Sequence, residues 1–217
     1  MPTCPPNKRH LPEIENRAAY DLIELKRDII SILGSDAILA EIASKSYIHK
    51  NGFMKIVYET CEETICRLHI YPPGASADKN IHDHRWDFDS ITICGTLPMS
   101  CYYIDEGSSE ILHLYSKTPG GGHLIESQFK CSAEFIDTIY VGKLQGYKMP
   151  YDLFHRIEAV DELTITYVET YPAISASCHL VSSEDRSGVG SVQPEPLTIT
   201  DTRQALALIV NKLEELE

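Results

Sequence analysis

The sequence predicts an all-β core built as a double-sheet jelly roll. From Tyr47 onward the chain divides into short segments rich in β-branched and aromatic residues, and turns rich in Gly, Pro, Asp and Ser separate them. Many short strands at such spacing are typical of β-sandwiches and barrels. The expected strands are 53–60, 64–71, 81–88, 90–97, 99–105, 111–116, 123–131, 134–141, 146–149, 153–159, 163–170 and 175–182.

Two helices are expected before this core. Apolar residues recur at helical spacing from Pro12 onward, and Pro is favoured in a first helical turn. Gly34 is expected to close this helix, and Ser35 or Asp36 to cap a second, short helix that ends near Ser44. Each helix offers one apolar stripe, so we expect both to pack on the outside of the β core.

A third helix is expected after Thr200 or Asp201, where apolar residues again follow a helical period. The chain of 217 residues suits one structural domain with decoration. We expect residues 1–46 to form a tail and helices that pack on the barrel, residues 47–183 the barrel itself, and residues 184–217 a linker and helix. The sequence contains no internal repeat.

The charge balance argues against two classes of partner. The chain has 19 Lys and Arg against 32 Asp and Glu, which gives a formal net charge of −13. Nucleic acids and anionic membrane surfaces are bound by clustered Lys and Arg, and this chain has no such cluster beyond Lys8-Arg9-His10. We therefore expect neither partner, and a monomer or homodimer.

The cysteines and the N-terminus predict a cytoplasmic protein. The number of cysteines is odd, no pair forms Cys-x-x-Cys, and most lie in apolar segments, which is typical of reduced, buried thiols. The first residues lack the apolar stretch of a signal peptide, and no apolar run is long enough to span a membrane. The seven are Cys4, Cys61, Cys66, Cys94, Cys101, Cys131 and Cys178.

The candidate metal ligands are histidines. His82 and His84 lie two residues apart in an expected strand, where both side chains would point to one face. A third nitrogen ligand has to come from elsewhere, and His155, in a strand-like segment after Pro150, is the candidate. A lone histidine in a strand is more often a hydrogen-bonded core or rim residue, and we interpret the others in that way: His10, His49, His69, His113, His123 and His179.

These positions resemble the two motifs of the cupin superfamily. The first comprises Gly74, His82-x-His84 and Gly95, and the second Gly146, Pro150 and His155. The segments 81–84 and 155–158, with Tyr171-Pro172 and the preceding helices, resemble cysteine dioxygenase and related thiol dioxygenases over roughly residues 12–180. The resemblance implies that His82, His84 and His155 hold one Fe(II) ion inside a small jelly-roll barrel. Three protein ligands leave positions open for substrate and O2.

The sequence departs from the cupin pattern at the acidic fourth ligand. Many cupins supply a Glu a few residues after the histidine pair; here Asp87 and Asp89 follow, and Phe88 falls at the position counted back from Gly95. One of the two aspartates could be a fourth ligand; we favour the interpretation that they are residues of the solvent face or acceptors for a ligand histidine's other N–H. The cysteine that crosslinks to a tyrosine in animal cysteine dioxygenases has no counterpart, because Cys94 does not align with it.

The substrate-binding residues also differ. In cysteine dioxygenases an arginine on an early strand binds the substrate carboxylate, and His49 stands at that point here. Arg67 or Arg85 could replace it, because a guanidinium matches a carboxylate in shape and charge. Tyr47 and Tyr171 are further candidates, and a Ser-His-Tyr relay is not evident near residues 166–171.

The main functional hypothesis is a mononuclear non-haem Fe(II) dioxygenase, an oxidoreductase that acts on a small thiol or amino-acid-like substrate with O2. One alternative is a metal cupin that works as an isomerase or lyase with Zn, Mn or Ni as Lewis acid. Another is a barrel that binds a small ligand without catalysis. A 2-oxoglutarate oxygenase is disfavoured because its His-x-Asp/Glu pair is absent, and a hydrolase because no nucleophile elbow is present.

Overall fold

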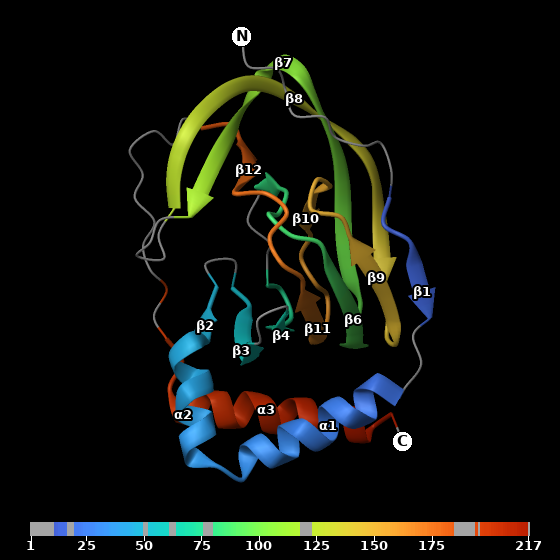
Figure 1. Cartoon of the computed structure of the whole chain (residues 1–217). Helices are drawn as coiled ribbons and strands as arrows, with labels where there is room; N and C mark the ends of the chain where they lie inside the picture. The colour runs from blue at the N-terminus through green and yellow to red at the C-terminus, as the bar shows by residue number, and fades with distance from the viewer. Residues whose placement is uncertain are drawn as a thin grey trace.

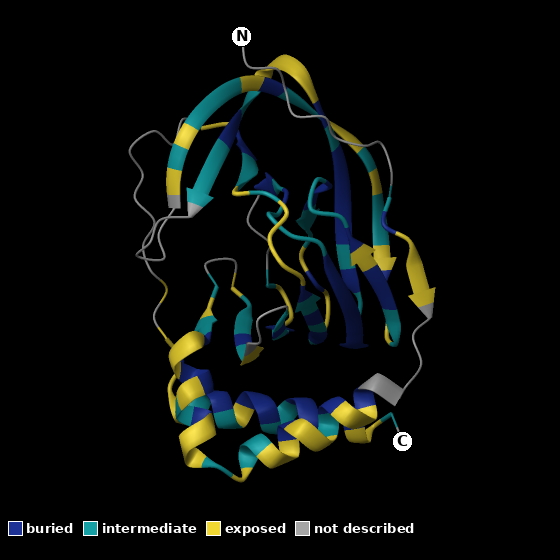
Figure 2. Cartoon of the chain, viewed as in Figure 1, coloured by how far each residue is buried: buried dark blue, intermediate teal, exposed yellow. Residues whose placement is uncertain are grey.

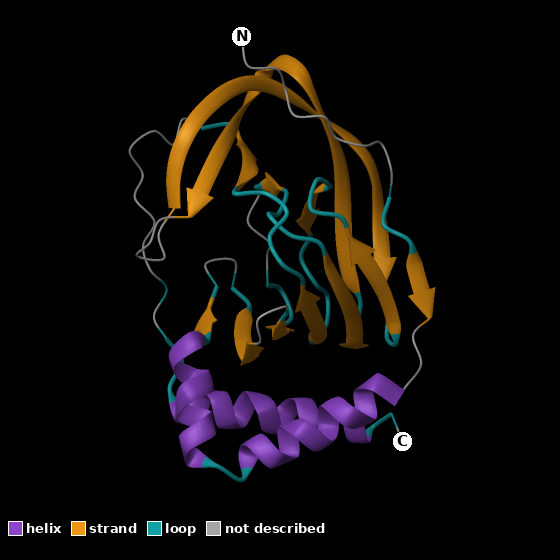
Figure 3. Ribbon diagram, in the orientation of Figure 1, coloured by secondary structure: helices purple, strands orange, loops and turns teal. Residues whose placement is uncertain are grey.

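Two antiparallel sheets form the core of the computed structural model, and three helices lie beside one of them (Figures 1 and 3). The structure describes residues 11–16, 20–49, 52–60, 64–75, 80–117, 123–184, 194 and 196–216. The predicted fold class, an all-β core with N-terminal and C-terminal helices, is confirmed.

The larger sheet has seven strands in the order β1-β9-β6-β11-β4-β3-β2. In chain order these are β1 (Ile14–Asn16), β2 (Tyr47–Ile48), β3 (Met54–Thr60), β4 (Ile65–Tyr71), β6 (Phe88–Cys94), β9 (Gln145–Met149) and β11 (Thr164–Thr170).

The smaller sheet has five strands in the order β10-β5-β12-β7-β8, namely β5 (Ile81–His82), β7 (Leu97–Lys117), β8 (His123–Val141), β10 (Phe154–Ile157) and β12 (Ser177–Ser182). The long strand β7 uses its two halves differently: Met99–Tyr102 pairs with β10, and Ile111–Ser116 pairs with β12. β10 also pairs with β5, and β5 pairs with β12. The strands β5, β12, β7 and β10 therefore form a closed ring of pairings, in which β10 lies against β5.

The helices cover the outer face of the seven-stranded sheet. They are α1 (Tyr20–Leu33), α2 (Asp36–Lys45) and α3 (Ile199–Glu214), and their exposed residues point away from the sheet (Figure 2). Alternation along β4 divides its side chains: Leu68 and Ile70 pack in the helix-facing core, whereas Tyr71 packs in the core between the sheets. The inner face of this sheet is therefore the wall that faces the candidate metal ligands.

The helix expected from Pro12 begins later than predicted. Ile14–Asn16 is a strand paired with β9, with Ile14 opposite Tyr147, and the helix starts at Tyr20. An edge-strand pairing thus overrides the helical spacing of the apolar residues. The following elements agree with the prediction: α1 ends at Leu33, and the Ser35 side chain accepts from the backbone N–H of Ile38 at 3.4 Å to cap α2.

Several expected strands have other boundaries. Segment 81–88 is a strand at 81–82 and again at Phe88, where β6 begins, and segments 99–105 and 111–116 are parts of β7. Likewise 123–131 and 134–141 are parts of β8. The pairing of β7 with β8 shifts register between Glu106 and Glu110, among the polar residues near 107, and continues beyond that bend. The last helix starts at Ile199, capped by Thr198 and Asp201 in a capping box.

Some expectations lie outside the described residues: residues 1–10 of the expected tail and most of the linker that was expected from residue 184 to the last helix. Cys4 and Cys61 fall outside them too, and the five cysteines that the structure describes form no disulfide with one another. No helix among the described residues has the length and apolar character needed to cross a lipid bilayer.

Gly95, in the turn between β6 and β7, should tolerate no side chain. Its φ is +75°, and a Cβ there would lie 2.5 Å from the Leu163 carbonyl oxygen. We expect Gly95→Ala to lower the unfolding free energy by about 3 kcal/mol. Gly52→Ala is the matched control, because Gly52 has a φ of +82° with open space around it, and should cost about 1 kcal/mol. Equal losses in urea unfolding would contradict this account of the turn.

Candidate metal centre

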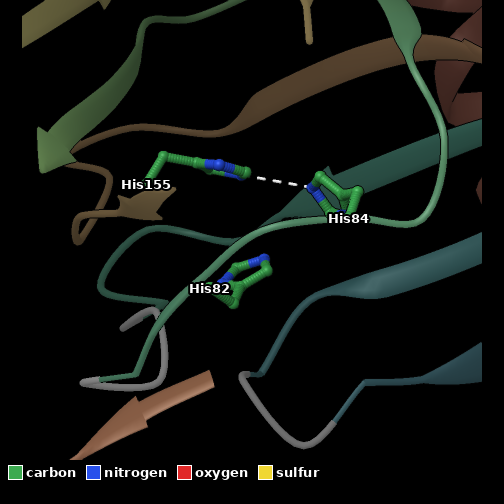
Figure 4. Close-up of side chains that lie close together, drawn as sticks. All are labelled: His82, His84 and His155. Atoms are coloured by element: carbon green, nitrogen blue, oxygen red, sulfur yellow. Dashed lines mark hydrogen bonds between the residues drawn. The ribbon is translucent and has the colours of Figure 1, made fainter. Parts of the chain in front are cut away.

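The structure brings His82, His84 and His155 together between the sheets (Figure 4). One ring nitrogen from each lies within 4.8 Å of the others, and no other group of this kind is found among the described residues. His82 ends β5 and lies directly opposite His155 of β10 in the antiparallel register, with their ring centroids 4.7 Å apart. The contact between β5 and β10 therefore places two of the three rings.

His84 reaches the cluster from a loop. The prediction that His82 and His84 share one face of a strand is wrong, because β5 ends at His82. Backbone hydrogen bonds hold the loop instead: the His84 N–H donates to the Tyr151 carbonyl at 3.0 Å, and the Tyr151 N–H donates to Asp87 Oδ1 at 2.7 Å. These two bonds tie the loop after β5 to the turn before β10, so that His84 faces His155.

The hydrogen bonds of the rings leave their Nε2 atoms for a ligand. His155 Nδ1 lies 3.1 Å from the Leu153 carbonyl oxygen and His82 Nδ1 lies 3.4 Å from that of Asn80, so both Nδ1–H groups donate to backbone. Nε2 of His84 and Nε2 of His155 are 3.3 Å apart. Two nitrogens that ligate one ion at about 2.0–2.1 Å stand roughly 3.0–3.4 Å apart, so the separation of His84 and His155 fits a transition metal, and a ring nitrogen of His82 lies within 4.8 Å of both.

Burial keeps His84 and His155 in the neutral form that binds metals. It lowers the pKa of His155 to about 3, with the neighbouring His82 adding to the effect. Burial also holds the pKa of His84 well below its ordinary value, and nearby cationic groups, Lys55 and Arg67 among them, act in the same direction. A neutral imidazole offers a lone pair, whereas a protonated one offers none.

Asp83, between His82 and His84, points away from them and toward β12. Its carboxylate accepts from the His179 backbone N–H at 2.5 Å and lies 2.6 Å from His179 Nδ1. The Asp83 N–H in turn donates to the His179 carbonyl at 3.2 Å. From the sequence Asp83 was given no role, although an acid between two candidate ligands was an available signal; the interpretation of His179 as a hydrogen-bonded residue agrees with this contact. This clamp fixes the backbone on which His82 and His84 stand.

Asp87 and Asp89 do not belong to the histidine cluster. Asp87 accepts the Tyr151 N–H, which makes it a brace for the loop. Asp89 lies on β6 two residues before Ile91, which packs in the helix-facing core, so its side chain points away from the histidines. Phe88 faces them instead, with its ring centroid 5.0 Å from that of His84.

Trp86 forms part of the wall beside the cluster. Its ring stacks near His84 at 6.1 Å between centroids and 22° between planes. The guanidinium carbons of Arg67 and Arg85 lie 5.3 and 4.9 Å from the Trp86 ring centroid. Both predicted substrate-binding arginines thus border the residue that covers His84, and each gains a cation–π contact there.

The other predicted substrate-binding residues lie farther out. His49 stacks on Phe53 at 4.7 Å, and the Tyr47 ring lies 5.8 Å from Lys55 Nζ. Tyr171 is 38% exposed, and its backbone N–H donates to the Asp87 carbonyl at 3.1 Å.

The polar residues of β11 do not form a relay to the histidines. The Tyr167 hydroxyl donates to the Cys66 thiol at 3.5 Å, and Tyr167 packs with the helix-facing core. The Thr170 hydroxyl donates to the Ile65 carbonyl at 3.2 Å. These hydroxyls are thus engaged on the sheet itself.

No protein-family model matches the sequence, and no curated protein matches it. Solved structures with a similar fold include oxalate decarboxylase of Bacillus subtilis, at 14% identity over 59% of this chain and 27% of that chain, with a TM-score of 0.36. An RmlC-like cupin from Shewanella frigidimarina has 14% identity over 60% and 86% of the two chains and a TM-score of 0.30. A hydroquinone 1,2-dioxygenase in complex with Cd2+ has 11% identity over 54% and 63%, with a TM-score of 0.32. Similarity at this level establishes no shared activity.

Removing the Asp83 clamp should weaken metal binding. We expect Asp83→Ala to reduce Co(II) affinity about 10- to 100-fold, because the segment that holds His82 and His84 loses its anchor on β12. Asp161→Ala, at an exposed acid of another loop, is the control and should bind as the wild type does. Isothermal titration calorimetry measures both, and equal affinities in two folded variants would contradict the role of the clamp.

The metal-free protein should lose stability as the pH falls below about 6.5. Unfolded histidines protonate near pH 6.5, whereas His155 stays neutral in the fold down to about pH 3. Above pH 6.5 His155 therefore takes nothing from the free energy of unfolding. Between pH 6.5 and pH 3 this one residue lowers the free energy of unfolding by up to about 1.4 kcal/mol for each pH unit. His155→Gln should flatten the pH dependence of urea unfolding by that amount between pH 6 and pH 4.5. An unchanged slope would show that His155 does not carry this effect.

Proposed function

We propose that the chain is a metal-dependent enzyme of the cupin kind, which binds one Fe(II) ion through His82, His84 and His155 and oxidises a small substrate with O2. The observation that supports it most strongly is the convergence of three imidazoles, two of them 3.3 Å apart at Nε2. The likeness of the two histidine motifs to thiol dioxygenases supports the oxygenase class.

The ligand set favours a metal ion that has open coordination positions and keeps its full positive charge. Three imidazoles carry no negative charge, and no carboxylate joins the described cluster, so a divalent ion would keep its charge for exogenous ligands. Fe(II) held there would supply the redox chemistry that O2 requires. A small thiol or amino-acid-like molecule fits this requirement, because a thiolate or amine can join the histidines as a further ligand.

The contribution of the chain is to orient the rings and to exclude water. The carbonyls of Asn80 and Leu153 fix the orientation of His82 and His155 through their Nδ1–H groups. Phe88 and Trp86 cover His84 on two sides. Side chains of both sheets pack into one apolar core next to the cluster, so a bound substrate would meet a dry, preformed wall.

The same ligand set also suits a second function, that of an isomerase or lyase. Three histidines with an open position are the ligand set of Lewis-acid zinc sites, and imidazole does not distinguish Zn or Ni from Fe. Such an enzyme would polarise a substrate oxygen and would need no O2.

The test combines metal content with O2 uptake. Protein loaded with Fe(II) under anaerobic conditions should hold about one iron per chain and, with O2, convert at least one member of a panel of small thiols and amino acids. His84→Ala and His155→Ala should retain less than about a tenth of the metal, because each removes a ligand. His113→Gln is the matched control: His113 is also buried, but it contacts Ser182 through Nε2 at 3.0 Å outside the cluster.

Two results would contradict the proposal in different ways. If the wild type binds no transition metal, or if both alanine variants bind it as the wild type does, the three-histidine site is wrong. Turnover at full rate without O2, and with Zn or Mn in place of Fe, would leave the site intact and identify a lyase or isomerase.

A further inference from the structure

The strand β8 lies at one edge of the smaller sheet. It is the last strand in the order β10-β5-β12-β7-β8, and among the described residues it pairs only with β7, with which it forms a long arch (Figure 1). Its 19 residues make it much longer than the roughly 3–10 residues usual for a strand. A long edge strand is a surface to which a further strand can be added.

The contacts of β8 with β7 show which of its backbone groups point to the edge. The Ala133 N–H donates to Glu110 Oε2 at 3.0 Å, and the Cys131 carbonyl accepts from the Ser109 hydroxyl at 3.5 Å, so both groups point toward β7. Backbone groups alternate in direction from one residue of a strand to the next. The groups that point away from β7 therefore belong to the alternate residues, which are Lys130, Ser132 and Glu134.

The charges on this part of β8 complement those of a second copy. Lys130 and Glu134 are exposed, lie on one face of the strand and stand two residues to either side of Ser132. If two copies of β8 pair antiparallel about a two-fold axis at Ser132, Lys130 of each lies directly opposite Glu134 of the other. Opposite charges in this position stabilise a strand pair. Centring the pairing on Lys130 or on Glu134 would instead set like charges opposite each other, which is unfavourable.

The other face of β8 is complementary in the same register. Phe129 and Ala133 pack against the apolar cluster beneath the arch, and Cys131 is buried in that cluster. Pairing about the same axis sets Phe129 opposite Phe135 of the second copy, and Cys131 opposite Ala133. Phe135 is 56% exposed in the single chain, so an aromatic partner would cover it. The two small residues between the rings would let the strands approach.

Two irregularities limit the length of this pairing. The ladder between β7 and β8 shifts register between Ser127 and Ile125 and again between Asp137 and Phe135. Such bulges bend a strand and disrupt a regular ladder. Residues 129–135 lie between the two shifts, and their outward groups could form about six backbone hydrogen bonds with a second copy. The regular stretch thus coincides with the complementary one.

Charged residues on an edge strand often prevent pairing rather than promote it. A charge pattern that blocks association presents repulsion to a second copy, whereas this one presents attraction in one register. The chain has a net charge of −13, so two copies repel each other at long range. A local match of charge is therefore what two such acidic chains would need in order to associate in one specific way.

We propose that two copies of this chain associate through β8, antiparallel about Ser132, so that the smaller sheet continues from one copy into the other. The contact is isologous: each copy contributes the same residues, and its two-fold axis ends the association at a dimer. The three clustered histidines lie on other segments, so the dimer does not depend on the proposed function.

The test exchanges the charges at positions 130 and 134. Equilibrium ultracentrifugation of the full chain at about 0.1 mM should give twice the mass of one chain. Lys130→Glu and Glu134→Lys each set like charges opposite each other at two symmetric positions, and each should weaken the dimer about 10- to 100-fold. The double variant Lys130→Glu/Glu134→Lys restores opposite charges and should dimerise as the wild type does.

Two further samples separate the charge register from other effects. An equimolar mixture of the two single variants should form a mixed dimer, because one variant carries Glu at both positions and the other carries Lys. Lys143→Glu is the matched control, since Lys143 is an exposed lysine beyond the end of β8, and it should dimerise as the wild type does.

The outcomes decide the proposal without reference to metal or substrate. Wild-type protein that stays monomeric at about 0.1 mM would overturn it. Dimers that are equally tight in both single variants would also overturn it, because the copies would then meet through another surface. Dimerisation restored in the double variant or in the mixture upholds it, since a second charge change would not repair a misfolded chain. Failure of both to restore the dimer would overturn the register about Ser132.

Discussion

The antiparallel contact between β5 and β10 is the feature on which the candidate metal centre depends. Each strand is short, and a single register pair, His82 opposite His155, joins them. β10 is held from its other side by four pairs with β7, and β5 is held by two with β12. The long, bent strand β7 thus supplies the stability that two such short strands would lack by themselves.

The interior of the molecule combines groups that are costly to bury. Three imidazoles meet between the sheets, and the side chains of Lys55, Arg67 and His69 lie on the face of the seven-stranded sheet next to them. The proposed divalent ion would complete the imidazoles. The helix-facing side of the same sheet carries apolar residues such as Leu68 and Ile70, so one alternating strand pattern packs against the helices on one face and carries polar groups on the other.

The sequence was sufficient to predict the fold class and the three clustered histidines, because both depend on local patterns. Runs of β-branched residues between turns identify strands, and a histidine pair with one distant partner identifies a candidate site. It was insufficient for the way in which His84 reaches the cluster, because His84 lies in a loop that is held by a hydrogen bond to Tyr151 of a distant turn. The clamp from Asp83 to His179 and the pairing of Ile14 with β9 are likewise tertiary contacts that no local pattern encodes. Alternation on β4 and β3 could have grouped Arg67, His69 and Lys55, once the pairing of these strands was known.

The most direct test of the central claim is a crystal structure of the Co(II)-loaded protein with anomalous data collected on both sides of the cobalt absorption edge. The account predicts one anomalous peak per chain that disappears below the edge, about 2.0–2.2 Å from one ring nitrogen of each of His82, His84 and His155. A peak elsewhere, a peak bound by fewer than three of these histidines, or no peak in crystals of metal-saturated protein would contradict it.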